Sequence, residues 1–327
     1  MKPIASISLD LDNKWAYMKA QGNPRWQDWP TYLPMIVPRI LDVLRDRDLK
    51  ITFFVVGQDA EHEVNLEPLR MIANAGHEIA NHSYNHEPWL HLYGPKQLAE
   101  EFDKTETAIF NATGQLPVGF RGPGFSLSDE VLRTLMRRGY LYDGTSFPTF
   151  LGPVARAYYF WSSGLSKDQK NDRKELFGRF TDGLKSLTPY SFGWRGKTIV
   201  ELPVTTMPIF RLPIHGSYIQ FLGQYSSFLA KAYFRFALGL CKLWKVKPHF
   251  LLHPLDFMGV EDDQDMAFFP TMGEPSAEKV KLISECIDIL NRDYKVVTTK
   301  EHVMRAKVNE LPASSISVVP EGVRVGT

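Results

Sequence analysis

The chain has 327 residues, enough for one large domain or two smaller ones, each with a full hydrophobic core. Hydrophobic residues make up 44% and charged residues 23%, which is ordinary for a globular protein, and the formal net charge is +1. Such a balance gives no overall attraction to a polyanion, so we expect no nucleic acid among its partners.

The compartment is predicted from two further features. The two cysteines, Cys241 and Cys286, lie in apolar stretches, which argues against a disulfide framework and favours a reducing environment. The first residues show no secretory signal, and no run of about 18 uncharged apolar residues indicates a transmembrane helix. We therefore expect a cytoplasmic protein, whose oligomeric state the sequence leaves open.

Strand-like and helix-like segments alternate along the chain, which predicts a parallel β/α architecture. Strands are predicted at residues 4–11, 51–56, 78–80, 118–121, 198–204, 250–253 and 296–297, with another beginning at residue 141. Helices are predicted at residues 33–47, 66–75, 97–111, 128–138, 228–244 and 276–291. Roughly seven or eight strands are enough for a (β/α) barrel, although the pattern alone does not distinguish a barrel from an open sheet.

Two segments fall outside this alternation. Residues 149–197 carry aromatic clusters around a charged run, and we interpret them as a lid-like insertion within a single domain, residues 1–305. Residues 306–327 have no periodicity and are expected to form a C-terminal surface tail.

Two histidines, His82 and His86, directly follow the short predicted strand at residues 78–80. The loop after a strand lies at the active-site end of a β/α barrel, and two histidines four residues apart can both reach one ion. Taken alone, this spacing more often reflects two unrelated histidines.

Two carboxylates supply context for these histidines. Asp10 and Asp12 end the first predicted strand and point to the same side of it, because side chains alternate along a strand. Turn chemistry would explain Asp12, but not Asp10 within an apolar run. Buried carboxylates are costly unless they bind cations or hydrogen-bond donors, and a hydrolytic metal needs a hard oxygen ligand.

Five short blocks carry a family resemblance. In chain order they are Ser8–Asp12, His82–His86, Arg121–Phe125, Tyr142–Asp143 and Leu251–Pro254. With these blocks the chain resembles the polysaccharide deacetylases of the NodB-homology type, carbohydrate esterase family four. The resemblance implies a distorted (β/α) barrel of seven or eight strands. It also implies a metal-dependent hydrolase that removes an N-acyl group from an amino sugar.

The resemblance also implies roles for the first three blocks. Asp12, His82 and His86 would be the ligands of one divalent metal ion. Zn²⁺ suits these ligands best, although Co²⁺, Fe²⁺ or Ni²⁺ would also fit them. Asp10 would be the catalytic base, and Arg121 would pair with it, unless that arginine merely caps a strand at the surface.

Three more residues receive roles by resemblance. The backbone N–H of Gly124 would stabilise the oxyanion, although the family usually has a larger residue there and a plain turn glycine is an equal alternative. His253 would be the general acid that protonates the leaving amine, and Asp143 would orient or charge-tune it. A turn residue is the alternative for Asp143. Glu201 could reach the substrate or form a structural ion pair, and His249 has no partner pattern.

The substrate is less defined. Leu11 separates the two aspartates that the commonest family form has adjacent, as in a subset that resembles peptidoglycan deacetylases and allantoinase-like amidohydrolases. Without a secretory signal, we expect an N-acylated sugar or glycan precursor, nucleotide-linked or lipid-linked, in surface-glycan assembly. The alternatives are an amidohydrolase or deformylase for another amide, and a catalytically silent carbohydrate-binding descendant of the fold.

Residues 218–247 interleave aromatic and basic side chains. An amphipathic segment of this kind could lie peripherally on the inner face of a membrane. The alternative is an outer helix of the barrel with one buried face.

Overall fold

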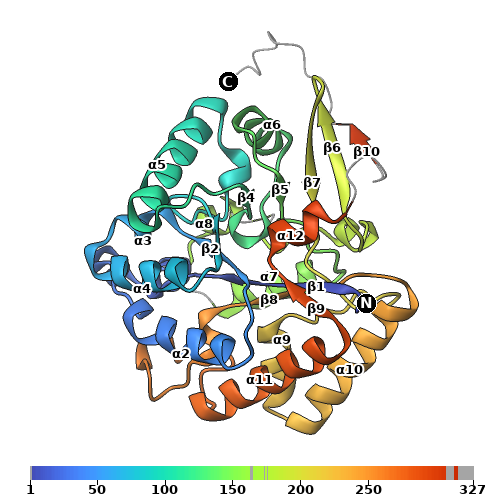
Figure 1. Cartoon of the computed structure of the whole chain (residues 1–327). Coiled ribbons are helices and arrows are strands. Elements are labelled where there is room, and N and C mark those ends of the chain that lie inside the picture. The colour runs from blue at the N-terminus through green and yellow to red at the C-terminus, as the bar shows by residue number, and fades with distance from the viewer. Residues whose placement is uncertain (1, 163–164, 173, 175, 307–312, 316–327) are drawn as a thin grey trace.

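The computed structural model describes residues 2–162, 165–172, 174, 176–306 and 313–315. Figure 1 shows strands at the centre with helices around them. In sheet order, the central parallel strands are β7 (Lys197–Glu201), β5 (Tyr142–Asp143), β4 (Gly119–Phe120), β3 (Glu78–Asn81), β2 (Thr52–Val55), β1 (Ile4–Asp10) and β8 (His249–Leu252).

The two ends of this sheet approach each other just beyond β7. The Thr205 N–H donates to the His249 carbonyl at 3.1 Å, and the His249 N–H donates to the Thr205 hydroxyl at 2.7 Å. The chain that continues β7 therefore meets β8 and completes a ring. This is the predicted distorted barrel, with its closure made by an irregular segment instead of a regular strand pair.

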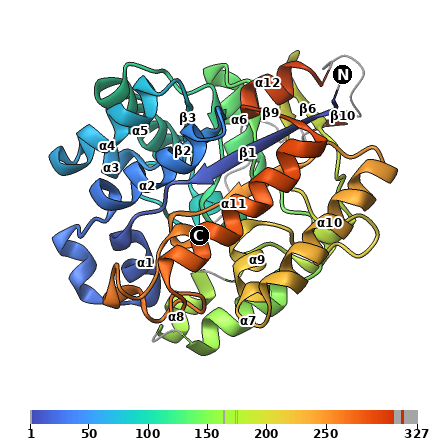
Figure 2. The same cartoon turned by 60° about the horizontal axis from the view of Figure 1, so that its bottom comes forward.

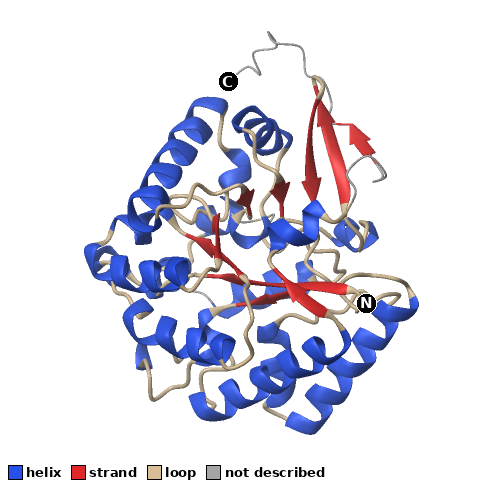
Figure 3. Ribbon diagram, viewed as in Figure 1, coloured by secondary structure: helices blue, strands red, loops and turns tan. Residues whose placement is uncertain are grey.

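Helices surround the ring (Figure 3). The six predicted helices are confirmed as α2 (Leu33–Arg45), α4 (Glu63–Asn74), α5 (Pro95–Thr113), α6 (Asp129–Arg138), α10 (Ser227–Leu243) and α11 (Ser276–Asp293). Further helices that the pattern did not predict are α1 (Lys14–Gln21), α3 (Gly57–Glu61), α7 (Gly152–Ser162), α8 (Lys167–Asp172), α9 (Gly216–Gly223) and α12 (Thr299–Met304). Single 3₁₀ turns lie at Pro24–Asp28, Leu90–Leu92, Pro123–Phe125, Phe180–Leu184, Pro254–Phe257 and Gln264–Met266.

Three strands extend the sheet outside the ring. Strand β9 (Lys295–Val297) pairs in parallel with β1, and β6 (Tyr190–Trp194) pairs antiparallel with β7. The end of the predicted insertion therefore belongs to the sheet, while α7 and α8 lie in its earlier part. Strand β10 (Ala313–Ser315) pairs with β6, so part of the expected tail joins the sheet too. The rest of that tail, residues 307–312 and 316–327, lies outside the described residues.

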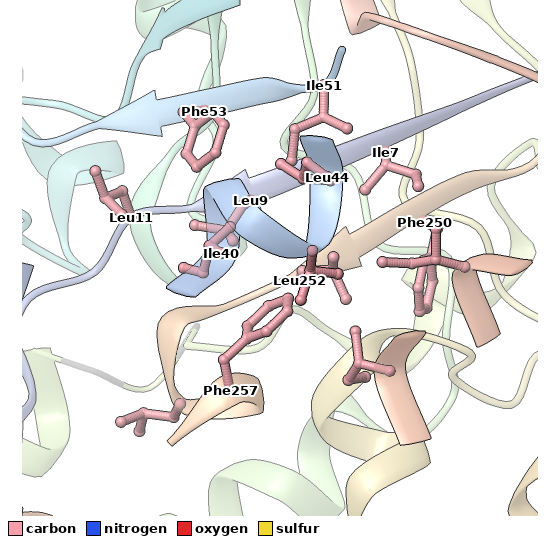
Figure 4. Packing of buried hydrophobic residues seen from close by; sticks show 14 of the residues in the cluster. Ile7, Leu9, Leu11, Ile40, Leu44, Ile51, Phe53, Phe250, Leu252 and Phe257 are labelled. Atoms are coloured by element: carbon pink, nitrogen blue, oxygen red, sulfur yellow. The ribbon is translucent and has the colours of Figure 1, made fainter. Parts of the chain in front are cut away.

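Strand β1 is buried on both faces, and its two faces have opposite chemistry. Ile7 and Leu9 point outward and pack with Leu44 of α2 and Phe250 of β8 in the main hydrophobic core (Figure 4). Ser6, Ser8 and Asp10 alternate with them and point into the ring. The strand thus anchors the barrel with one set of side chains and supplies its polar interior with the other.

Candidate metal centre and active site

Three predicted ligands meet at the end of β1 and β3. The Oδ1 atom of Asp12 lies 3.3 Å from His82 Nε2 and 3.0 Å from His86 Nε2, and one ligand atom from each residue lies within 4.8 Å of the others. His82 and Asp12 are buried, and His86 is half-buried. The structure therefore brings both histidines and one carboxylate to a single point.

The protonation of His82 indicates what this cluster can hold. Its Nδ1 lies 2.7 Å from the carbonyl oxygen of Arg121, which can only accept, so Nδ1 carries the proton. In the neutral ring Nε2 then presents a lone pair to Asp12 Oδ1. Burial raises the pKa of Asp12, but the positive charge of the two histidines when they are protonated, together with their hydrogen bonds, outweighs burial and holds that pKa well below its usual range. Lone pairs that converge on one point suit a cation, so the donor set fits a divalent metal.

The loop between the two histidines is held by a buried carboxylate that sequence reasoning missed. Glu101 of α5 accepts the backbone N–H groups of Tyr84 at 2.9 Å and Asn85 at 2.8 Å, and also the Asn85 side chain at 2.8 Å. These bonds fix a backbone in which His86 has a positive φ of 52°. Glu101 lies in an acidic stretch of helix that resembles an exposed face, so its burial gave little sequence signal.

Asp10 lies between the ligand cluster and His253. Its Oδ2 atom is 4.0 Å from His82 Nε2 and 4.0 Å from His253 Nε2. Its Oδ1 atom lies 2.5 Å from Nη1 of Arg121, which also donates to Ser8 Oγ at 2.9 Å. One oxygen is thus fixed by the arginine while the other faces the site.

Arg121 is fully buried, so the alternative of a surface arginine is wrong. Its Nε donates to the Gly144 carbonyl at 2.8 Å, and its Nη2 lies 3.1 Å from Nε2 of His249. Burial and the arginine charge lower the pKa of His249 well below its usual value, so this ring is neutral and can accept. His249 had no recognised role in the sequence, but it lies four residues before His253, on the same face of an extended chain.

His253 has hydrogen-bond partners other than the residue predicted to orient it. Its backbone N–H donates to Asp256 Oδ2 at 2.8 Å, and the Ser217 hydroxyl lies 3.3 Å from the ring Nδ1. Asp143 instead accepts the Thr145 hydroxyl at 2.5 Å and faces Glu201. Among the described residues no hydrogen bond or ion pair joins Asp143 to His253, so an orienting or charge-tuning role for Asp143 stays a prediction. The side chain of Asp143 is aimed at the neighbouring strand β7.

Asp143 and Glu201 form a pair of buried carboxyl groups. Glu201 also accepts the Ser146 N–H at 2.7 Å. Burial and the adjacent Asp143 raise the pKa of Glu201 well above its usual value, and burial raises that of Asp143. Two carboxyl groups in contact without a bonded cation share a proton. Among the described residues Glu201 forms this carboxyl pair and no ion pair, and its contact with substrate stays a prediction.

Gly124 adopts a conformation that favours glycine, with φ 61° and ψ 23°. A Cβ atom there would collide with Leu176, which belongs to the inserted segment. The Phe177 N–H also donates to the Gly124 carbonyl at 3.1 Å, and Arg156 of α7 donates to the Leu176 carbonyl at 3.0 Å. The insertion therefore fills the space that a larger residue at position 124 would occupy.

Comparisons with known proteins agree with this geometry. Residues 26–142 match the model of the family described as "Polysaccharide deacetylase". A Gibberella zeae "peptidoglycan deacetylase-like protein FGM2" is 36% identical over 175 residues, 51% of this chain and 49% of that protein. A Bacillus cereus "peptidoglycan-N-acetylglucosamine deacetylase" is 30% identical over 125 residues, 38% of this chain and 44% of that protein. The matches thus span less than half of either relative.

A solved structure extends the likeness to the whole fold. The crystal structure of a "putative polysaccharide deacetylase" from Mycobacterium smegmatis superposes with a TM-score of 0.61 and 20% identity, and it covers 98% of this chain and 96% of that one. The barrel, the ordered sequence blocks and the family match lead to one conclusion. The chain resembles the polysaccharide deacetylases in sequence over residues 26–142, and nearly its whole length shares the fold of a protein described as one of them.

Proposed function

We propose that the chain is a metal-dependent hydrolytic N-deacetylase of an amino sugar. The observation that carries this proposal is the convergence of Asp12 Oδ1, His82 Nε2 and His86 Nε2 within 4.8 Å, with Asp10 beside them. These three residues would hold one divalent ion, for which Zn²⁺ is the first candidate. When bound, such an ion lowers the pKa of a water ligand and polarises an amide carbonyl.

The chain's own groups divide the proton transfers. Asp10 Oδ2 faces the site while Arg121 fixes Oδ1, so Asp10 can accept the proton of the attacking water. His253 lies on the other side of Asp10 at 4.0 Å and can give a proton to the leaving amine. The N–H of Gly124, in a turn fixed by Leu176, would donate to the developing oxyanion.

The substrate class follows from the relatives. One of the two named above is called a peptidoglycan-N-acetylglucosamine deacetylase and the other peptidoglycan deacetylase-like, which supports an N-acetylated amino sugar here. Our proposal includes a glycan precursor, nucleotide-linked or lipid-linked, used in surface-glycan biosynthesis at the cytoplasmic side of a membrane.

A second candidate is a deformylase or another amidohydrolase with a small acyl group. Leu176 occupies the space beside Gly124, where the family usually places a larger side chain. If that space borders the acyl group, a formyl or acetyl group fits and a longer chain does not.

The experiment is release of acetate and formate from N-acetylated and N-formylated amino sugars, supplied free, nucleotide-linked and lipid-linked. We expect acetate from at least one N-acetyl sugar. The Asp10→Asn variant should retain its metal and lose turnover by ~10²–10⁴-fold. Formate without acetate would establish the second candidate. Full metal content with neither product would indicate a silent binding protein and refute both.

A further inference from the structure

Helix α10 carries apolar side chains on two opposite faces. Its buried face consists of Ala230, Phe234, Ala237, Leu238 and Cys241. On the other side Phe228, Leu229, Phe236 and Leu243 are 71%, 60%, 56% and 69% exposed, and we call these four the outer stripe. At about 100° per residue they fall within one arc of roughly 100°, centred opposite the buried face. Packing against the barrel explains the buried face alone.

The position of α10 leaves the outer stripe accessible in the described structure. Figure 2 shows α10 at the edge of the molecule, beside α9 and α11. Exposed apolar side chains gathered on one helix face, with polar residues around them, are typical of a protein or membrane interaction site. Within the part of the chain that the structure describes, no helix is long and apolar enough to cross a bilayer.

The surroundings of the outer stripe are strongly basic. Residues 202–255 contain six Lys or Arg and no Asp or Glu, although the whole chain has a net charge of only +1. Four of these cations, Arg235, Lys242, Lys245 and Lys247, are exposed and make no ion pair with any described residue. The nearby carboxylates of α11 already have partners, since Glu285 lies 2.5 Å from Lys231 and Asp288 lies 2.7 Å from Arg47.

A row of rings joins this surface to the candidate active site. Phe125, which follows Gly124, stacks on Phe147 at 4.7 Å between ring centroids, and Phe147 contacts His215 at 5.6 Å. His215 lies 6.4 Å from His253 and begins α9. Along α9 the row continues through Tyr218, Phe221 and the exposed Tyr225, with centroids 6.4, 6.3 and 5.6 Å apart in turn. Tyr225 lies two residues before the start of α10.

We propose that the outer stripe of α10 docks peripherally on an anionic lipid surface. Exposed Phe and Leu side chains would enter the headgroup region, and Arg235, Lys242, Lys245 and Lys247 would contact lipid phosphates. Trp244 is half exposed among these cations, and tryptophan favours the membrane–water interface. Through the row of rings, docking would place the active site near a lipid-linked sugar. That last consequence rests on the proposed function, whereas the docking itself does not.

The test is co-sedimentation of the full chain with vesicles of phosphatidylcholine alone or mixed with phosphatidylglycerol, without any sugar substrate. We expect binding to the mixed vesicles that weakens as salt is raised. Phe236→Ser should lower the partition coefficient about 10-fold, and Lys242→Ala about 5-fold. The matched controls are Leu116→Ser and Lys96→Ala, exposed residues near and on α5, which should bind like the native chain.

Circular dichroism of each variant would verify that it folds, since all four positions are exposed. Absence of vesicle binding, or equal loss in the α5 controls, would overturn the docking proposal. The proposal would also be overturned if the native chain did not bind vesicles but formed concentration-dependent dimers that Phe236→Ser abolished. The outer stripe would then bind a second copy of the chain. Vesicle binding without any deacetylation would preserve this proposal while the proposed function failed.

Discussion

Two buried carboxyl groups of the barrel have partners of opposite chemistry, a cation in one case and a second carboxyl in the other. Asp10 on β1 lies 2.5 Å from the guanidinium of Arg121. Asp143 on β5 faces Glu201 on β7, and burial with a second carboxyl raises the pKa of Glu201 well above its usual value. A carboxylate beside a cation stays ionised and can accept a proton from a substrate. A buried carboxyl beside a second carboxyl keeps its proton, so it forms a structural hydrogen bond.

The comparison separates a motif residue that faces the proposed active site from one that faces a neighbouring strand. Both Asp10 and Asp143 end strands of the ring, and both are buried. Only Asp10 has its second oxygen near His82 and His253. Asp143 instead ties β5 to β7 and to the loop whose Gly144 carbonyl accepts Arg121. We infer that the contact between Asp143 and Glu201 fixes this loop and so helps to hold Arg121 against Asp10.

The largest effect is expected from Arg121→Met. The substitution leaves Asp10 charged and buried without its cation, and the Gly144 carbonyl loses its hydrogen-bond donor. The free energy of unfolding should therefore fall by about 3–5 kcal/mol. The measurement is urea unfolding followed by circular dichroism. The control is Arg45→Met, whose exposed pair with Asp42 should contribute less than ~1 kcal/mol. An equal loss in both variants would contradict the distinction between buried and exposed pairs.

A smaller effect is expected from Glu101→Ala. This variant tests a third kind of partner for a buried carboxylate, namely backbone N–H groups. Removal of the acceptor leaves the N–H groups of Tyr84 and Asn85 unpaired and should cost about 1–3 kcal/mol. The loop to His86 would loosen, so metal affinity should fall ~10–100-fold in a calorimetric titration. The matched control is Glu100→Ala, an exposed neighbour on the same helix. Unchanged affinity would show that Glu101 does not position the loop.

The smallest effect is expected from Glu201→Gln, below ~1 kcal/mol at acidic pH, because an amide can replace a protonated carboxyl. Glu201 has a raised pKa in the folded chain, so its stabilisation is complete below its unfolded pKa and is lost as the pH rises through the folded value. Native stability should therefore decline with rising pH more steeply than that of the variant. If the urea midpoints of the native chain and of Glu201→Gln changed with pH in the same way, a proton shared by Asp143 and Glu201 would be contradicted.

Much of the fold could be predicted because long periodic segments dominate it. Helices such as α5 and α11 repeat apolar residues over many turns, and β1 alternates cleanly. Short helices such as α9 and α12 offer too few residues for a period to emerge. The closure at Thr205 depends on side-chain and backbone bonds of an irregular segment, which no pattern encodes.

The site residues that lie at the ends of neighbouring strands could be predicted from the sequence. The hydrogen-bond partners that come from elements distant in the chain could not. Asp10, Asp12, His82 and Arg121 all follow or end strands, and they meet as expected from parallel strands. The partner of Asp143 lies 58 residues later on β7, so turn chemistry gave no sign of it. The exposure of the outer stripe on α10 likewise depends on which face the barrel covers.

The most direct test of the proposed metal centre is metal content after dialysis against a divalent ion, measured on the native chain beside Asp12→Asn and Asp143→Asn. We predict close to one ion per native chain, loss in Asp12→Asn, and full retention in Asp143→Asn, whose carboxyl faces Glu201 and not the ligand cluster. Equal metal content in Asp12→Asn and the native chain, both shown to be folded, would contradict a centre built on Asp12, His82 and His86.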